Sequence, residues 1–124
     1  MRFVIWNVRG LGTDLKLNAV KKLVREQQVQ VLLLQETKKT AISEDEVRKL
    51  WVDEFHFRVG NAVGRSGGLL TLWDKNCFRL GKVSIQDRII SVSGVWIPKD
   101  VQVTIINIYA SWIHCIGYWE GISM

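Results

Sequence analysis

The stretch VQVLLLQETK, residues 29–38, constrains the fold more than any other part of the chain. Its four consecutive apolar residues, 31–34, are typical of a strand that is buried on both faces of a sheet. The run continues into Gln35 and Glu36, so a carboxylate stands at the rim of a core. Because an uncompensated buried charge is costly, Glu36 needs a cation, a metal ion or water beside it.

Residues 2–10 repeat this design, since the apolar residues of RFVIWN end at Asn7, just before the turn-forming RGLG. Residues 15–28, between the two segments, carry apolar side chains at helical spacing. This order indicates a strand–helix–strand unit whose two strands are parallel neighbours. Asn7 and Glu36 would then meet at the carboxyl ends of the strands, where open α/β sheets bind their ligands. We therefore expect a hard-metal site made of one amide oxygen and one carboxylate.

The rest of the chain changes from helical to alternating periodicity. Ser43–Glu46 has the pattern of a capping box and predicts a second helix over about residues 43–52. Five strand candidates follow, at residues 55–59, 69–74, 77–85, 88–97 and 101–110. Consecutive strands imply antiparallel pairing, so we expect an α+β fold in which two helices cover one side of a mixed sheet. That sheet is expected to include residues 3–7, 31–35 and 103–109.

Composition limits the class of protein. The chain has 124 residues, of which 48% are hydrophobic and 23% charged, and this suits one folded domain. Its formal net charge of +5 is compatible with a polyanionic partner, but the diffuse distribution favours ordinary solvated faces. Cys77 and Cys115 stand alone, which indicates neither a zinc site nor a disulfide framework. Without a signal-peptide pattern or an apolar run of membrane-spanning length, we expect an intracellular protein.

Four short motifs follow one another along the chain. They are WNVRG (6–10), LLLQET (32–37), GGL (67–69) and NIY (107–109). The glycine pair itself indicates a turn, since no helix follows it as a P-loop requires. The ordered set resembles the endonuclease/exonuclease/phosphatase superfamily, whose fold is shared by DNase-like and apurinic/apyrimidinic endonucleases. It is most similar to the endonuclease domain at the start of plant LINE-type (non-LTR) retrotransposon polyproteins, over roughly residues 2–110.

The resemblance implies metal-dependent hydrolysis of phosphodiester bonds in DNA, with Mg²⁺ or Mn²⁺ as the cofactor. Asn7 would orient the phosphate or a metal-bound water, and would serve beside Glu36 in holding the metal. Tyr109 would direct its hydroxyl toward the scissile phosphate. A single carboxylate can be enough to hold Mg²⁺, because this ion prefers oxygen ligands and retains several waters.

Each of these residues also has a simpler explanation. Asn7 could cap the turn that follows it, and Glu36 could pair with Lys38 or Lys39. Tyr109 could be a core aromatic residue with one end in water. The resemblance favours the metal role for Glu36 and the ligand role for Asn7, and it leaves both explanations open for Tyr109.

Two parts of the family pattern are missing from this sequence. It has no Gly-Asp-Phe-Asn-like segment to supply a water-activating aspartate, and no Ser-Asp-His-like segment to supply a histidine. His56 and His114 match neither place. We therefore expect residues 1–110 to form the N-terminal half of the domain, a partial α/β sandwich of the DNase-like type whose second half is missing. Residues 111–124 would be an unmatched tail.

These observations predict a truncated metal-dependent endonuclease of retrotransposon origin that is inactive in this chain and, if functional, would act in the nucleus. The alternatives are a non-catalytic basic nucleic-acid-binding remnant and a functionless translated relic. Half of a two-sheet fold would leave an apolar sheet face uncovered, which predicts self-association through that face. The candidate residues of this face are Leu70, Leu72, Val92, Val103 and Ile105.

Overall fold

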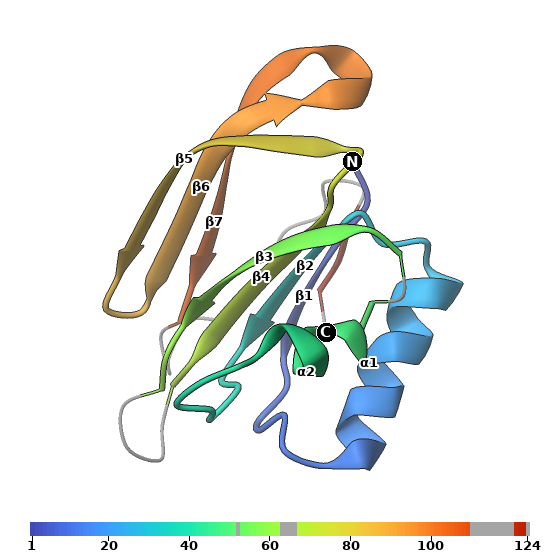
Figure 1. Ribbon diagram of the computed structural model, residues 1–124, viewed down its shortest axis with the longest axis vertical. Coiled ribbons are helices and arrows are strands. Elements are labelled where there is room, and N and C mark those ends of the chain that lie inside the picture. Colours follow the sequence, from blue (N-terminus) through green and yellow to red (C-terminus); the bar gives the residue numbers. More distant parts are fainter. Residues whose placement is uncertain (52, 63–66, 110–120, 124) are drawn as a thin grey trace.

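The computed structural model describes residues 1–51, 53–62, 67–109 and 121–123, and Figure 1 shows how their elements are arranged. The strands are β1 (Phe3–Asn7), β2 (Val31–Gln35), β3 (Phe55–Gly60), β4 (Leu69–Asp74), β5 (Phe78–Gln86), β6 (Ile89–Trp96), β7 (Val101–Ile108) and β8 (Gly121–Ser123). The helices are α1 (Asp14–Glu26), α2 (Glu44–Arg48) and a short 3₁₀ helix, η1 (Ile97–Lys99). The α+β class is confirmed, and the seven expected strands begin and end within a residue or two of their predicted bounds.

The strands form two sheets. The first has five strands in the order β3-β4-β2-β1-β8, and the second has three in the order β5-β6-β7. β1 and β2 are parallel, with Asn7 opposite Gln35, which confirms the parallel pairing of the strand–helix–strand unit. β4 is antiparallel to both β2 and β3, so the first sheet is mixed.

The expectation that residues 103–109 would join the sheet of β1 and β2 is wrong. β7 belongs to the second sheet, where it is antiparallel to β6 with Ile105 opposite Val92. The physical reason is local: β5, β6 and β7 follow one another through short turns, so hairpin pairing satisfies their backbone groups at once. Their alternating pattern then provides one apolar face, which covers the first sheet instead of extending it.

The two helices lie on one face of the first sheet (Figure 1), as expected. α1 begins after Thr13, whose side chain accepts a hydrogen bond from the backbone of the first turn. Val20 and Val24 are its buried residues, whereas Lys22 and Arg25 are exposed and Lys16 and Lys21 are partly buried. Most of the stability of this helix therefore comes from packing of its apolar stripe against the sheet.

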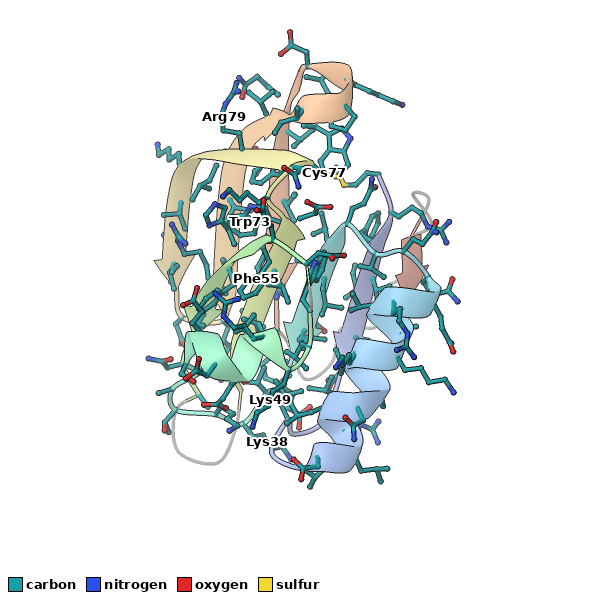
Figure 2. All side chains as sticks on the ribbon, turned by 45° about the vertical axis from the view of Figure 1, so that its right-hand side comes forward. Lys38, Lys49, Phe55, Trp73, Cys77 and Arg79 are labelled. Carbon is teal, nitrogen blue, oxygen red and sulfur yellow. The ribbon has the colours of Figure 1, made fainter. Side chains whose placement is uncertain are left out.

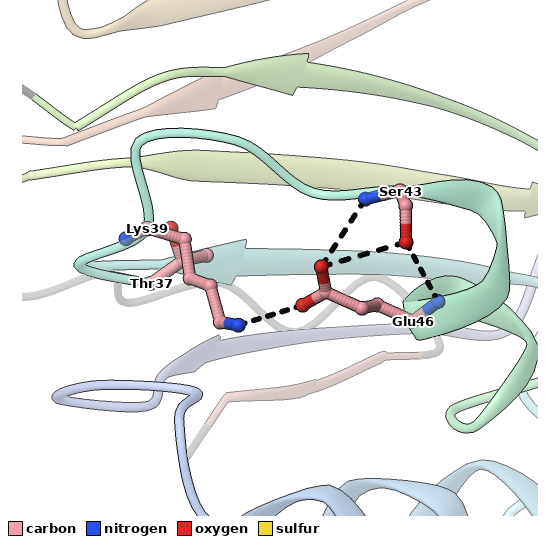
Figure 3. A network of polar contacts seen from close by, with 4 residues as sticks. All are labelled: Thr37, Lys39, Ser43 and Glu46. Atoms are coloured by element: carbon pink, nitrogen blue, oxygen red, sulfur yellow. Dashed lines mark hydrogen bonds and ion pairs between the residues drawn. The ribbon is translucent and has the colours of Figure 1, made fainter.

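α2 begins as the sequence predicts but ends earlier. Ser43 and Glu46 form the expected capping box, drawn in Figure 3. The helix stops at Arg48, several residues before the predicted end. Leu50 and Trp51 leave the helical path and are nevertheless buried in the core. Their burial outweighs another turn of helix, because so short a helix gains little from its own propensity.

β2 contributes to two apolar cores because its side chains alternate between the faces of the first sheet. Leu32 and Leu34 pack on the side of the helices, whereas Val31 and Leu33 pack on the side of the second sheet. The core between the sheets also contains Leu69, Trp73, Phe78, Ile90, Val92 and Trp96. This double burial explains the continuous apolar run in the sequence.

The prediction that five apolar residues would lie on an uncovered sheet face is also wrong. Leu70 and Leu72 are buried under the helices, and Val92 and Ile105 are buried between the two sheets. Val103 packs, partly buried, against the same core. The error lay in assuming that a second half of the domain must supply the second sheet, whereas β5, β6 and β7 of this chain already cover the first. Among the residues that the structure describes, the large apolar side chains that are exposed are Leu15, Val83, Ile85, Ile97, Val101, Ile106 and Ile108.

The predicted tail at 111–124 lies outside the described residues, except for 121–123. These three residues form β8, which pairs in parallel with β1, Phe3 standing opposite Gly121. Among the helices that the structure describes, none is long and apolar enough to cross a membrane.

Candidate active site

Three loops meet where β1 and β2 end and β4 begins. The N–H of Gly10 donates to the carbonyl of Glu36 at 2.8 Å, which joins the loop after β1 to the loop after β2. On the other side, the N–H of Thr37 donates to the carbonyl of Gly68 at 3.1 Å. The loops thus extend the hydrogen bonding of the sheet beyond its strands, and Glu36 occupies the middle position.

Glu36 has an unusual backbone conformation for a residue with a side chain. Its φ is 56°, in the left-handed region, and Arg9 and Lys38 on the same loops have φ values of 51° and 57°. Such conformations persist only where the surrounding structure enforces them, and they concentrate at functional sites. Here the hydrogen bonds on both sides of Glu36 provide that enforcement. Its side chain is 21% exposed, so the carboxylate reaches water at the rim of the sheet.

Glu36 forms an ion pair with Lys38, whose Nζ lies 3.5 Å from Oε1 of the carboxylate. The side chain of Lys38 is 44% exposed, and Figure 2 labels it at the loop end of the molecule. Lys39 takes a different partner, Glu46, with Nζ and Oε2 2.6 Å apart (Figure 3). Ion pairs near the surface contribute little free energy, so this pair would not prevent a divalent cation from binding Glu36.

Asn7 ends β1 and is partly buried. Its Oδ1 accepts a hydrogen bond from the N–H of Arg9 at 3.1 Å, so the side chain does cap the turn that follows it. An amide oxygen has two lone pairs, and the cap uses one of them. Asn7 therefore retains one acceptor position for a further donor or a cation.

Tyr109 directly follows β7. Its N–H donates to the carbonyl of Arg88 at 3.0 Å, and its ring packs, partly buried, against the core between the sheets. Tyr109 and Arg88 line an open pocket of about 270 Å³, together with Asn61 and Gly68. This pocket adjoins the loop of Glu36, because Gly68 is the residue that accepts from Thr37.

A buried pair of amides connects the two sheets at this end. Gln35 Nε2 donates to the carbonyl of Ile108 at 2.7 Å and lies 3.5 Å from Oδ1 of Asn107. Asn107 Nδ2 lies 3.2 Å from the carbonyls of both Leu34 and Leu70. The sequence reasoning gave these two residues no role. The available signal was an asparagine at a position of β7 whose inward neighbours are all apolar.

The structure places the three predicted site residues at one end of the two sheets. Asn7 ends β1, Glu36 follows β2, and Tyr109 follows β7, whose last peptide touches Gln35. No direct hydrogen bond joins their three side chains. His56 lies elsewhere, because it pairs with Trp73 near the opposite end of β4. His114 is outside the described residues.

The oxygen donors at this rim are of the chemical type that a hard cation prefers. Among the described residues, no three His, Cys, Asp or Glu side chains gather into a metal-binding group. Burial, with the nearby Asp74, raises the pKa of the Cys77 thiol, which keeps it protonated and unsuited to a soft metal. Glu36 and Asn7 remain as oxygen donors, and that set suits Mg²⁺ or Mn²⁺ held weakly with several waters. A cation bound there would supply positive charge for a phosphate oxygen.

Comparison with known proteins agrees with the observed fold. A family model, described as the Endonuclease/Exonuclease/phosphatase family, matches residues 4–116. Among solved structures, the AP endonuclease LMAP from Leishmania major is similar in fold, with a TM-score of 0.63 and 24% sequence identity. The similarity covers 86% of this chain and 39% of that one, so this chain spans well under half of the solved enzyme. No curated protein matches. Since the family model covers most of the sequence, the chain belongs to the endonuclease/exonuclease/phosphatase family.

Proposed function

We propose that this chain is the N-terminal part of a metal-dependent endonuclease domain that hydrolyses phosphodiester bonds in DNA. The observation that carries the proposal is Glu36, a carboxylate held in a strained conformation where three loops meet at the rim of a sheet. A family of nucleases and phosphodiesterases provides the chemical context. The order of WNVRG and LLLQET supports an origin in a plant LINE-type retrotransposon.

In this proposal Glu36 holds Mg²⁺ or Mn²⁺, and Asn7 offers Oδ1 as a second oxygen or orients the phosphate. Tyr109 uses its hydroxyl as a hydrogen-bond donor to a phosphate oxygen. The spare acceptor position of Asn7 and the partial exposure of Glu36 and Tyr109 support these roles.

The same rim carries basic side chains that suit a nucleic-acid backbone. Arg9 and Lys38 lie on the loops that contain the strained residues, and Arg88 lines the pocket beside Tyr109. With a net charge of +5, the chain should bind DNA in a salt-dependent way, because cations that contact phosphates release counterions. Binding without cleavage is therefore the second candidate function, and the nucleus is the compartment in which either would act on chromosomal DNA.

The chain alone should not cleave DNA. Its sequence contains neither an aspartate in a Gly-Asp-Phe-Asn-like segment nor a histidine in a Ser-Asp-His-like segment. Catalytic groups that act as a unit fail together, so we expect the surviving groups alone to give no detectable nicking. In plasmid nicking with Mg²⁺, we expect the wild type to be no faster than Glu36→Ala. A clear rate loss in the variant would contradict the proposed inactivity.

The metal and DNA roles are tested by binding of a fluorescent duplex with and without Mg²⁺. We expect Mg²⁺ to strengthen binding by the wild type, because it links the carboxylate to a phosphate. Glu36→Gln should lose this enhancement, whereas Glu26→Gln, an exposed carboxylate on α1, should keep it. An equal Mg²⁺ effect in all three proteins would refute a metal role for Glu36.

The proposed origin is tested by the neighbouring genomic reading frames, where out-of-frame Gly-Asp-Phe-Asn-like and Ser-Asp-His-like segments are expected.

Self-association is proposed through β7 in place of the face that the sequence suggested. Within the described sheet β7 is an edge strand, and Val101, Ile106 and Ile108 are exposed along it. An edge strand with apolar side chains presents unpaired backbone groups to a second copy of the chain. The expected product is a dimer joined by pairing of two β7 strands.

A further inference from the structure

The amide bridge between the sheets stands out because most of that interface is apolar; the buried polar side chain of Thr71 lies beside it, with Oγ1 3.3 Å from Nδ2 of Asn107. Gln35 and Asn107 are 8% and 1% exposed, and the residues around them belong to the core between the sheets. Asn107 reaches from β7 to the carbonyls of Leu34 on β2 and Leu70 on β4. Gln35 reaches in the opposite direction, from β2 to the carbonyl of Ile108. The two side chains therefore tie the sheets together in both directions.

The two amides of the bridge are close neighbours, in the sequence, of two residues of the candidate site. Gln35 precedes Glu36 in the chain, and Asn107 stands two residues before Tyr109. The peptide between Ile108 and Tyr109 is held on both sides, its carbonyl by Gln35 and its N–H by the carbonyl of Arg88. Any sliding of one sheet over the other would break these bonds and change the separation of Glu36 and Tyr109.

We propose that Gln35 and Asn107 are positioning residues, which fix the alignment of the two sheets so that Tyr109 faces the cation site of Glu36. This inference rests on the proposed function of that site. Apolar contacts alone tolerate small shifts, since they are not directional. Buried hydrogen bonds are directional, and a buried amide that loses its partners carries a large desolvation cost. The bridge therefore selects one alignment among those that the apolar core would allow.

The test uses Mn²⁺ as a paramagnetic probe and fluorotyrosine as the reporter. The chain has two tyrosines, so a Tyr118→Phe background leaves Tyr109 as the only site for 3-fluorotyrosine. Mn²⁺ at Glu36 broadens the fluorine resonance of Tyr109 by an amount that falls very steeply with their separation. The main variant is Gln35→Met with Asn107→Leu, because it removes both amides of the bridge and keeps apolar side chains of similar size in their places. Gln35→Met alone is the second variant, should the double variant fail to fold.

Ile105→Ala is the matched control. Ile105 lies two residues before Asn107, on the same inward face of β7. Its truncation removes apolar contacts from the core but leaves both amide side chains of the bridge in place. We expect the bridge variants to lose Mn²⁺-induced broadening at Tyr109 while the Ile105→Ala protein keeps it. Equal broadening in wild type, bridge variants and control would overturn the proposal, and so would equal loss in the control and the bridge variants.

Failure of the proposed function has a different signature. If Mn²⁺ does not broaden Tyr109 in the wild type, the metal role of Glu36 fails, and the bridge is then judged by amide hydrogen exchange. The reporters are the N–H groups of Thr37 and Tyr109, which bond to Gly68 and Arg88. The proposal predicts exchange about tenfold faster at both in the bridge variants than in Ile105→Ala, from local opening near the lost hydrogen bonds. Equal exchange rates would overturn it.

Discussion

Gly68→Ala should distort the loop of Glu36 far more than the same change one residue earlier. Gly68 has a φ of 93°, which a residue with a Cβ rarely adopts. An added Cβ would overlap Oγ1 of Thr37 and would lie 3.2 Å from the backbone nitrogen of Lys38. Gly67 has a similar φ of 79°, but a Cβ there would meet no described atom within 4 Å.

The two glycines therefore separate backbone strain from steric overlap. A left-handed conformation costs a residue such as alanine about 1–3 kcal/mol, and both substitutions carry this term. Only Gly68→Ala adds the overlap with Thr37, which is 1% exposed. Overpacking of this kind adds about 1–3 kcal/mol. Against a typical net stability of about 5–15 kcal/mol, the total is a large loss.

Urea unfolding followed by circular dichroism measures both changes. We expect Gly68→Ala to lower the free energy of unfolding by about 1–3 kcal/mol more than Gly67→Ala. Thr37→Ala removes the overlapping hydroxyl, so the double variant with Gly68→Ala should recover most of this extra loss. Equal losses for the two glycines, or no recovery in the double variant, would refute the reasoning.

Three further outcomes are expected. Leu72→Ala should lower the free energy of unfolding by about 2–5 kcal/mol in urea titrations, because Leu72 is fully buried under the helices; a loss typical of a surface site would contradict that burial. The hydrogen bond from Lys39 lowers the pKa of Glu46 below its ordinary value of 4.5. The ionised Glu46 carboxylate therefore stabilises the folded state fully above pH 4.5, and this contribution is lost as the pH falls through the lowered pKa. Glu46→Gln should therefore weaken the fall of the melting temperature with pH in this acidic range. An unchanged pH dependence in the variant would argue against a stabilising Lys39–Glu46 pair. The double variant Ile106→Thr, Ile108→Thr should elute from size-exclusion chromatography as a monomer, whereas the wild type should elute as a dimer. A wild type that elutes as a monomer would contradict the proposed β7 interface.

The sequence predicted those features that depend on local pattern. The apolar runs before Asn7 and Gln35 located the central parallel strands, and Ser43–Glu46 located the start of α2. The single proline, Pro98, marked the connection between β6 and β7, where Asp100 takes a left-handed φ of 51°. In each case the determining interactions lie within a few residues of one another, so single-sequence reasoning reaches them.

The division into two sheets could not be predicted in the same way. The alternating residues of β5 show which side chains share a face, and the largely apolar run of β4 indicates burial on both faces, but neither pattern shows which strand lies alongside. The residues between them, 75–77, look like a hairpin turn, whereas the chain changes from the first sheet to the second there. Pairing of β4 with β2 satisfies the edge of the parallel pair, and this long-range choice has no local signature.

The candidate site divides similarly. Asn7 and Glu36 are visible in the sequence because each polar residue follows an apolar strand. The partners of Gln35 and Asn107 are set by the packing of one sheet on the other, and the two residues are 72 positions apart in the sequence. Arg88 lines the pocket of Tyr109 because it lies in the turn between β5 and β6. The pairing of these strands brings that turn beside the end of β7. Such contacts follow from the tertiary structure alone.

The central claim is that Glu36 offers its carboxylate to a divalent cation at the shared end of the two sheets. Anomalous X-ray diffraction from crystals soaked in MnCl₂ tests it most directly, since the signal locates manganese without reference to activity. The account predicts a peak beside the Glu36 carboxylate, with Lys38 displaced and Asn7 Oδ1 as the next protein oxygen, and no peak there in Glu36→Gln. A saturated crystal with manganese only at other carboxylates, or with none at Glu36, would contradict it.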